Sequence, residues 1–193
     1  MTKALLLDAD GVTLIKQGYF SEIYSREYSV PQEKIISFFK NEFRDCQLGK
    51  IDIKQVLPNY LKEWGWQKSV EDFLQYWFQK NTIADERVVN KVQEIRAKGT
   101  KCYLTTDQEK YRAEYTRKNL NFENMFDDCF FSCEAGYLKS DPEFFKTVLS
   151  KLNLQPSEVE FLDDEKENIE SASGVGIAAK LYSGISDLDK YLS

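Results

Sequence analysis

The sequence predicts an α/β fold in which a doubly wound parallel sheet carries an inserted helical domain. From residue 84 onward, short apolar runs alternate with helical patterns, which is typical of parallel strands joined by right-handed helical crossovers. Residues 15–83 differ in character, because they contain 14 of the 27 aromatic residues and all three tryptophans and have a helical pattern. We therefore expect an α/β core built from residues 1–14 and 84–193, with residues 15–83 inserted after the first strand.

The first predicted strand is the run of four apolar residues at 4–7, and it ends in two carboxylates, Asp8 and Asp10. Open α/β sheets place their chemistry at the carboxyl ends of strands. Carboxylates this close repel each other unless a cation lies between them, which favours a divalent metal with oxygen ligands, Mg²⁺ above all. A plain turn is the alternative, since Asp and Gly are turn residues. A calcium loop would continue with further oxygen ligands, whereas Val12 and Leu14 follow here.

Within residues 15–83, apolar side chains recur at helical spacing in two places. One helix face covers residues 35–43, with Pro31 in its first turn, and the other covers residues 70–77. Gly49 and Pro58 lie between these two stretches, and we expect them to interrupt the helical pattern there. Because both ends of the insert lie beside strand ends, we expect it to cover the carboxylate pair as a lid that excludes water. The alternative is that these helices only complete the core.

The remaining elements follow in regular alternation. Gly99 is typical of a helix end, and Asp141 and Pro142 are typical of a helix N-cap and first helical position. The pattern predicts a helix over 88–95, a strand over 102–106, a polar helix over 108–119, a strand over 129–131, a helix over 142–152 and strands over 159–162 and 177–182.

Polar residues at two further points could contact an anion. Thr105 and Thr106 end the second predicted strand and Asp107 follows, so a hydroxyl and the N–H groups of the next helix would meet there. The register leaves Thr105 or Thr106 as the anion binder, and we prefer Thr106. These residues could also simply cap the helix. Lys139, in a loop before a helix, could bind a phosphate or neutralise a carboxylate, or be a solvated surface lysine.

Asp163 and Asp164 close the strand predicted over 159–162. Adjacent acids at the end of an apolar strand are unfavourable unless a metal or hydrogen-bond donors meet them, although alone they could cap the next helix. Together with Asp8 and Asp10 they place four carboxylates at one edge of the sheet. This arrangement is hard to explain without a cation.

Composition narrows the possible functions. The chain has 193 residues, 42% hydrophobic and 30% charged, which is typical of a soluble globular protein. Its net charge of −6 and the lack of a basic stripe argue against nucleic acid as a partner. No apolar run is long enough to span a bilayer and no secretory pattern is visible, so we expect no membrane partner and a cytoplasmic location.

Histidine is absent, which excludes Ser–His–Asp and Cys–His catalysis and the commonest zinc sites. Acid–base chemistry must therefore come from carboxylates, Lys, Tyr or Cys. The four cysteines form no CxxC pair, and we expect them to be reduced thiols that are at least partly buried.

The order Asp8-x-Asp10-Gly-Val, then Thr106, then Lys139, then Asp163-Asp164 resembles the haloacid dehalogenase-like hydrolase superfamily. The resemblance covers essentially the whole chain, and the insert is similar to the C1-type helical cap of that family. It implies a Rossmann-like core and is closest to the small cytoplasmic phosphatases of the family, including the phosphatase-like domain of epoxide hydrolase.

The resemblance implies a two-step phosphoryl transfer. Asp8 would attack phosphorus and form an aspartyl-phosphate, and Asp10 would protonate the leaving oxygen and later activate water. Mg²⁺ would bind Asp8, the backbone carbonyl of Asp10 and the acidic pair. Asp164 is our choice for the direct ligand, with Asp163 nearby or acting through water.

The phosphate-binding set implied by the resemblance is Thr106, Asp107 and Lys139, of which Thr106 and Lys139 would hold the phosphoryl oxygens. Asp107 stands where the family commonly has Asn, so it would add negative charge near the phosphate and could lower activity or alter specificity. Ser140 replaces the common Pro after the lysine, which should matter little.

We expect a Mg²⁺-dependent phosphatase of a small phosphorylated metabolite, as a monomer or homodimer. Dehalogenases of the family lack the second aspartate and need no metal, and the caps of its phosphosugar mutases commonly supply a histidine, so both are less favoured. A non-catalytic binding or scaffold protein remains the contrasting class. Specificity should lie in the insert, through Lys16, Tyr19, Phe20, Arg44 and Gln47.

Overall fold

The computed structural model describes residues 2–192 and contains one five-stranded sheet in which every strand pairing is parallel. The strand order is β3-β2-β1-β4-β5, so the first strand of the sequence lies in the centre. The strands are β1 (Ala4–Leu7), β2 (Lys101–Thr106), β3 (Asp128–Phe131), β4 (Val159–Asp163) and β5 (Ala178–Leu181). The predicted α/β fold with a doubly wound parallel sheet is confirmed.

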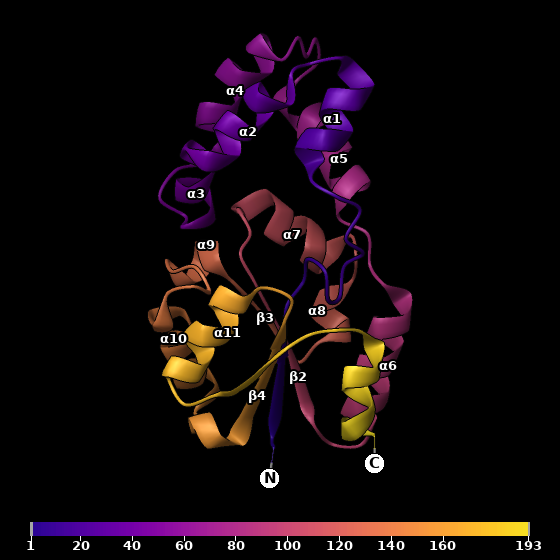
Figure 1. Cartoon of the computed structure of the whole chain (residues 1–193), viewed down its shortest axis with the longest axis vertical. Coiled ribbons are helices and arrows are strands. Elements are labelled where there is room, and N and C mark those ends of the chain that lie inside the picture. The colour runs from indigo at the N-terminus through magenta and orange to yellow at the C-terminus, as the bar shows by residue number, and fades with distance from the viewer. Residues whose placement is uncertain (1, 193) are drawn as a thin grey trace.

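Helices cover both faces of this sheet (Figure 1). One face is packed by α6 (Glu86–Ala97), α7 (Lys110–Lys118), α8 (Phe122–Met125) and the 3₁₀ helix η2 (Ile185–Tyr191). The other face is packed by α10 (Pro142–Leu152) and α11 (Lys166–Gly174). The short elements α9 (Ser132–Ala135) and η1 (Pro156–Glu158) lie in connections. Asp141 caps α10 by accepting a hydrogen bond from the Glu143 N–H, as the sequence predicts.

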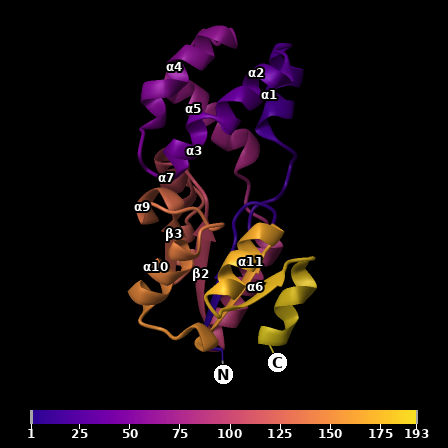
Figure 2. The same cartoon turned by 60° about the vertical axis from the view of Figure 1, so that its left-hand side comes forward.

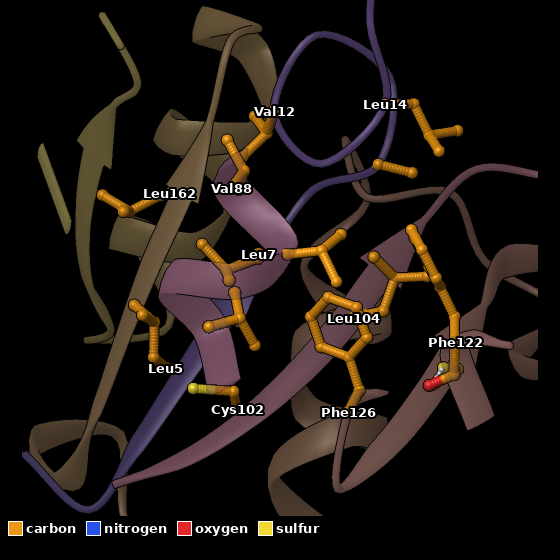
Figure 3. Packing of buried hydrophobic residues seen from close by; sticks show 14 of the residues in the cluster. Leu5, Leu7, Val12, Leu14, Val88, Cys102, Leu104, Phe122, Phe126 and Leu162 are labelled. Atoms are coloured by element: carbon orange, nitrogen blue, oxygen red, sulfur yellow. Dashed lines mark hydrogen bonds between the residues drawn. The ribbon is translucent and has the colours of Figure 1, made fainter. Parts of the chain in front are cut away.

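The central strand β1 is apolar along its whole length because both of its faces are buried. Leu5 and Leu7 belong to the cluster of buried side chains that Figure 3 shows, which includes Val88 of α6, Phe122 of α8 and Phe126, the residue after α8. Leu6 points to the opposite face, into the cluster formed by α10 and α11. Successive side chains of a strand alternate between faces, so the run of leucines fixes β1 between two helical layers.

The other five helices gather around an aromatic core of their own, at the carboxyl edge of the sheet (Figures 1 and 2). The three tryptophans belong to this cluster or pack against it, and its rings pack mainly tilted or edge to face. These helices are α1 (Phe20–Tyr28), α2 (Gln32–Lys40), α3 (Glu42–Gln47), α4 (Ile53–Glu63) and α5 (Val70–Asn81).

The two segments that connect these helices to the sheet run side by side. The Ile15 N–H donates to the Ile83 carbonyl at 2.8 Å, and the Asp85 N–H donates to the Thr13 carbonyl at 2.9 Å. An isolated antiparallel bridge pairs Leu14 with residue 84 between them. The chain therefore leaves the sheet and returns to it at one place.

Two local expectations were wrong. The helix face over 35–43 is divided between α2 and α3 by a turn at Asn41, whose ψ is −100°. In one straight helix Phe38 and Phe43 would point about 140° apart. The turn lets both enter the same core, with ring centroids 5.6 Å apart.

Pro58 does not interrupt the insert but lies inside α4. A proline there removes one intrahelical hydrogen bond. The helix persists because Leu57 and Leu61 are buried in the aromatic core and because the Asp52 side chain accepts the Lys54 N–H at its start.

The prediction of free thiols is confirmed for all four cysteines.

Candidate active site

A buried lysine bridges two buried aspartates at the carboxyl edge of the sheet. Asp8 follows β1 and Asp163 ends β4, and these strands pair with Leu7 opposite Leu162, so the two carboxylates lie next to each other. The Lys139 ammonium contacts Asp8 Oδ1 and lies 2.7 Å from Asp163 Oδ2. The exposed fractions are 3% for Asp8, 3% for Lys139 and 0% for Asp163. Lys139 is therefore part of the site and not a solvated surface lysine.

The charge state of Lys139 follows from its surroundings. Burial alone would lower its pKa, but the carboxylates of Asp8, Asp163 and Asp107 raise that pKa above its ordinary value. Lys139 therefore keeps its positive charge. For Asp8, burial raises the pKa, the Lys139 ammonium opposes the rise, and Asp163 and Asp10 add to it.

Asp163 is held in place by donors on several sides. Its Oδ1 accepts the Glu165 N–H at 2.7 Å, and its Oδ2 accepts from Asn168 Nδ2 at 3.1 Å in addition to Lys139. These contacts satisfy a carboxylate that has no access to water. They fix its orientation toward Asp8.

Asp164 completes an acidic cluster. One carboxylate oxygen from each of Asp8, Asp163 and Asp164 can be chosen so that all three lie within 4.8 Å of one another. The Asp164 side chain is 17% exposed and accepts from Lys16 Nζ at 2.7 Å. A Cβ atom at Gly11 would lie 2.3 Å from Asp164 Oδ2, so only glycine leaves this carboxylate its room. Three converging carboxylates without His or Cys form a hard oxygen set that fits Mg²⁺.

Asp10 turns away from this cluster and toward α7. Arg112 donates to both of its carboxylate oxygens, at 2.7 and 2.9 Å, and Gln108 Nε2 donates at 2.8 Å. Half of the Asp10 side chain is exposed. Partial burial raises the pKa of Asp10, but the Arg112 guanidinium and the Gln108 amide outweigh this rise, so the net pKa lies below the ordinary value.

Sequence reasoning missed Arg112. The guanidinium is buried and also donates to Thr82 Oγ1 at 2.8 Å, to the Asn81 carbonyl at 3.0 Å and to Gln108 Oε1 at 2.7 Å. It therefore joins Asp10 to the carboxyl end of α5. The one available signal was its spacing, because Arg112 lies one helical turn beyond Gln108 in a helix that otherwise looks solvated.

The residues at the end of β2 and just after it lie on the other side of Asp8 from Asp163. Thr106 lines the cavity described below, and its Oγ1 accepts from Gln108 Nε2 at 3.1 Å. The Thr105 hydroxyl instead donates to the Leu7 carbonyl at 3.4 Å inside the sheet. Asp107 Oδ1 accepts the Lys139 N–H at 2.9 Å. Burial raises the pKa of Asp107, and the Lys139 charge opposes this rise.

A cavity of about 560 Å³ lies between the sheet edge and helices α1, α2, α3 and α5. Of the residues predicted for the site, all but Asp163 line it; Asp163 is fully buried behind Asp8 and Lys139. Of the five residues predicted to set specificity, Lys16, Tyr19, Phe20 and Gln47 line the cavity and Arg44 does not.

Comparison with known proteins identifies the family. Residues 2–176 match the family model of the haloacid dehalogenase-like hydrolases. The chain therefore belongs to this family of hydrolases, and the resemblance inferred from its motifs is confirmed.

Within residues 2–192, no helix combines the length and apolarity needed to cross a membrane.

Two individual relatives are named as phosphatases. A phosphorylated carbohydrates phosphatase of Thermotoga maritima is 25% identical over 183 residues, which is 91% of this chain and 82% of that protein. The sesquiterpene phosphatase astK of Aspergillus oryzae is 30% identical over 94 residues, which is 48% of this chain and 47% of that protein.

Among solved structures, the HAD family enzyme BT-2542 of Bacteroides thetaiotaomicron matches with a TM-score of 0.81 and 20% identity over 94% of both chains. That enzyme has also been solved with magnesium and inorganic phosphate, and this structure matches with a TM-score of 0.79 and 19% identity over 95% of both chains. An L-2-haloacid dehalogenase of Xanthobacter autotrophicus matches with a TM-score of 0.68 and 16% identity over 93% of this chain and 76% of that one. At these identities the structures establish the shared fold.

Proposed function

We propose that this chain is a Mg²⁺-dependent phosphatase of a small phosphorylated metabolite, with Asp8 as the nucleophile. The observation that supports this most is the buried Lys139 between Asp8 and Asp163, next to the Asp164 carboxylate. A carboxylate nucleophile, a cation that can bind phosphoryl oxygens and a metal-binding acidic cluster then lie within one small space.

The residues present fit a Mg²⁺ ion. We propose that Asp8, Asp164 and the backbone carbonyl of Asp10 would hold it, while Asp163 supports them through its bonds to Lys139 and Asn168. When bound, Mg²⁺ would lower the pKa of Asp8 and neutralise charge on the phosphoryl group. A loaded site would need Asp164 in this position close to Asp8, and the absence of a side chain at Gly11 leaves the carboxylate room there.

In the first step, an oxygen of Asp8 attacks phosphorus, and the bond from phosphorus to the alcohol oxygen breaks. A protonated Asp10, which the Arg112 contact disfavours in the resting site, gives its proton to that oxygen, so the alcohol leaves neutral and Asp8 carries the phosphoryl group. Thr106 and Lys139 donate hydrogen bonds to the phosphoryl oxygens and stabilise the charge that spreads over them.

In the second step, water attacks phosphorus of the aspartyl-phosphate. Asp10, now ionised, takes the proton of the water, the acyl phosphate bond breaks, and inorganic phosphate and the Asp8 carboxylate result. Arg112 favours this ionised form of Asp10 through two charged hydrogen bonds. Residues 15–83 would act as the cap that closes over these steps and excludes water.

The alternatives fit the site less well. A dehalogenase needs no proton donor for its leaving group and no metal, yet Asp10 and the acidic cluster are both in place. A phosphosugar mutase would be expected to use a cap histidine, and this chain has none. A scaffold function would not require a lysine between two buried aspartates. The cytoplasmic location remains a prediction from the sequence.

Hydrolysis of p-nitrophenyl phosphate by the purified protein tests the proposal, with Mg²⁺ or with EDTA and with an Asp8→Asn variant. We expect nitrophenol release that EDTA abolishes and that Asp8→Asn reduces at least a thousandfold. Glu123→Gln, a change of an exposed acid that does not line the cavity, is the matched control and should keep full activity. Turnover retained by Asp8→Asn would exclude Asp8 as the nucleophile.

A further inference from the structure

The cavity over the catalytic residues is polar on the sheet side and largely apolar on the helical side. On the sheet side it is lined by carboxylates, Thr106, Lys139, Arg112 and Asn168. On the side of residues 15–83 it is lined by large apolar side chains, among them Ile15, Tyr19, Ile36 and Phe39, and by no acidic residue. The phosphate and the alcohol part of a substrate would therefore meet different surroundings.

Most polar side chains on the helical side already have partners within the protein. Gln47 Nε2 donates to the Asp107 carbonyl at 3.0 Å, and Asn81 Nδ2 donates to the Gly18 carbonyl at 3.2 Å. Gln32 donates to Ser21 Oγ at 3.3 Å, and Lys16 pairs with Asp164. Each of these contacts uses one donor of its group, so the group meets a ligand with only its remaining donors and acceptors.

Four residues on the helical side have polar side-chain groups that make no bond at all to the residues that the structure describes. Within the part of the chain that the structure describes, the lining residues of this side whose polar side-chain groups have no hydrogen-bond or ion-pair partner are Gln17, Tyr19, Lys40 and Trp77. The Trp77 indole N–H is buried, so a ligand cannot reach it without displacing its neighbours. The remaining three residues supply an amide, a phenol and an ammonium.

The apolar wall is fixed before any ligand binds. The Phe39 ring packs edge to face against Phe43 and Trp77, with ring centroids 5.1 and 5.4 Å away, and against Phe20 at 6.4 Å. Phe39 is nevertheless only half-buried and lines the cavity. Rings held by several neighbours form a rigid surface that an apolar ligand can cover without ordering the protein first.

A sugar would fit such a wall badly. Each of its hydroxyl groups gives up water on entering the cavity and needs a hydrogen-bond partner in return, and an unpaired hydroxyl weakens binding. An alkyl or aryl group gives up no hydrogen bonds and gains contact with Ile36 and Phe39. The surroundings of the leaving group thus favour an apolar alcohol.

We infer that the substrate is a phosphate monoester of a largely apolar alcohol and not a sugar phosphate. The inference rests on the proposed phosphatase function, and it deepens that function by assigning the alcohol to the wall formed by Ile15, Tyr19, Ile36 and Phe39. The phosphate lies against the catalytic residues and the alcohol lies under α1 and α2.

Two esters of primary alcohols give a matched test, because their leaving oxygens are chemically alike. We expect kcat/KM for 2-phenylethyl phosphate to exceed that for glucose 6-phosphate at least tenfold. Equal values, or a preference for glucose 6-phosphate, would overturn the inference while leaving the phosphatase intact. If neither ester nor p-nitrophenyl phosphate is hydrolysed with Mg²⁺, the proposed function fails and this inference falls with it.

A pair of variants tests whether the apolar wall causes the preference for an apolar alcohol. Phe39→Asn should raise KM for 2-phenylethyl phosphate at least tenfold and leave inhibition by inorganic phosphate, which occupies only the polar side, unchanged. Glu33→Gln, an exposed change on the same helix, should alter neither value. If Phe39→Asn does not fold by circular dichroism, Ile36→Asn at the cavity replaces it. An unchanged KM, or inhibition by phosphate weakened to the same extent, would contradict the assignment.

Discussion

Arg112 binds Asp10 through two parallel hydrogen bonds while the same guanidinium binds Thr82 and the Asn81 carbonyl at the end of α5. The proposed general acid and base is therefore oriented by a residue that also contacts the helical insert. A planar guanidinium can make all of these bonds at once, whereas an ammonium cannot.

Arg112→Lys should slow the reaction in a way that depends on the leaving group. We expect kcat for 2-phenylethyl phosphate to fall about 10- to 100-fold, because its alkoxide needs a proton from a correctly oriented Asp10. The fall for p-nitrophenyl phosphate should be much smaller, since nitrophenolate leaves without one. Steady-state kinetics on both esters measure the difference, with the exposed Arg87→Lys as control. An equal fall for both esters would indicate general damage instead of misplaced Asp10.

Asp107→Asn should strengthen phosphate binding. The side chain would keep an oxygen to accept the Lys139 N–H but would lose its negative charge next to the phosphoryl group. We expect KM for p-nitrophenyl phosphate to fall about three- to tenfold, with little change in kcat. Inhibition by inorganic phosphate provides a second measurement. A KM that stays the same or rises would show that this charge does not reach the phosphate.

Gly11→Ala should weaken metal binding specifically. Its Cβ would displace Asp164, and its φ of +88° is unfavourable for alanine. Gly65→Ala is the matched control, because its φ of +75° brings similar strain but nothing lies within 4 Å of the added atom. We expect Gly11→Ala to raise the Mg²⁺ concentration for half-maximal activity at least tenfold, and Gly65→Ala to lower stability only. Identical Mg²⁺ requirements in the two variants would disprove the role of Gly11.

Glu109 should make the stability of the fold depend on pH. Burial raises its pKa to about 7, although the Tyr111 and Arg112 N–H groups, which its carboxylate accepts, oppose the rise. The folded state then binds a proton more tightly than the unfolded state, whose glutamate has a pKa of about 4.3. The contribution of Glu109 to the free energy of unfolding should therefore be highest below about pH 4 and fall as the pH rises to about 7, by about 1.4 kcal/mol for each pH unit between the two pKa values.

Urea unfolding at pH 5 and pH 8 measures this effect. Glu109→Gln cannot ionise, so its free energy of unfolding should fall less between the two pH values than that of the wild type. The exposed Glu94→Gln should behave like the wild type. The idea is wrong if the Glu109→Gln and wild-type profiles run parallel.

The sequence predicted the sheet and most of the candidate site because both depend on periodic or local signals. Asp8, Thr106 and Asp163 each follow or end a run of apolar residues, and parallel strands bring such positions to one edge. Lys139 was placed only by its distance from a helix start, and its burial could not be seen from its loop.

What the sequence could not predict depends on side-chain direction in three dimensions. The polar pattern of α7 gave no sign that Arg112 turns inward. Its burial depends on hydrogen-bond partners such as Asp10 and Thr82, which are distant in the sequence. The turn at Asn41 likewise follows from how Phe38 and Phe43 share a core, which no spacing within the segment reveals. The Lys16–Asp164 pair joins residues 148 positions apart.

The pairing of Ile15 with Ile83 and of Thr13 with Asp85 has a consequence for how this enzyme can change. The insert begins and ends at adjacent backbone positions. A change in its length therefore does not move the strands of the sheet, and the backbone pairing at the junction does not depend on which residues lie between the two ends. We therefore expect that the residues for phosphoryl transfer and the residues that select the alcohol lie mainly in separate stretches of the chain. Exchanging the stretch between the paired residues for that of a relative should transplant its substrate preference, provided that Lys16, Asn81 and Thr82 are kept for their bonds to Asp164 and Arg112.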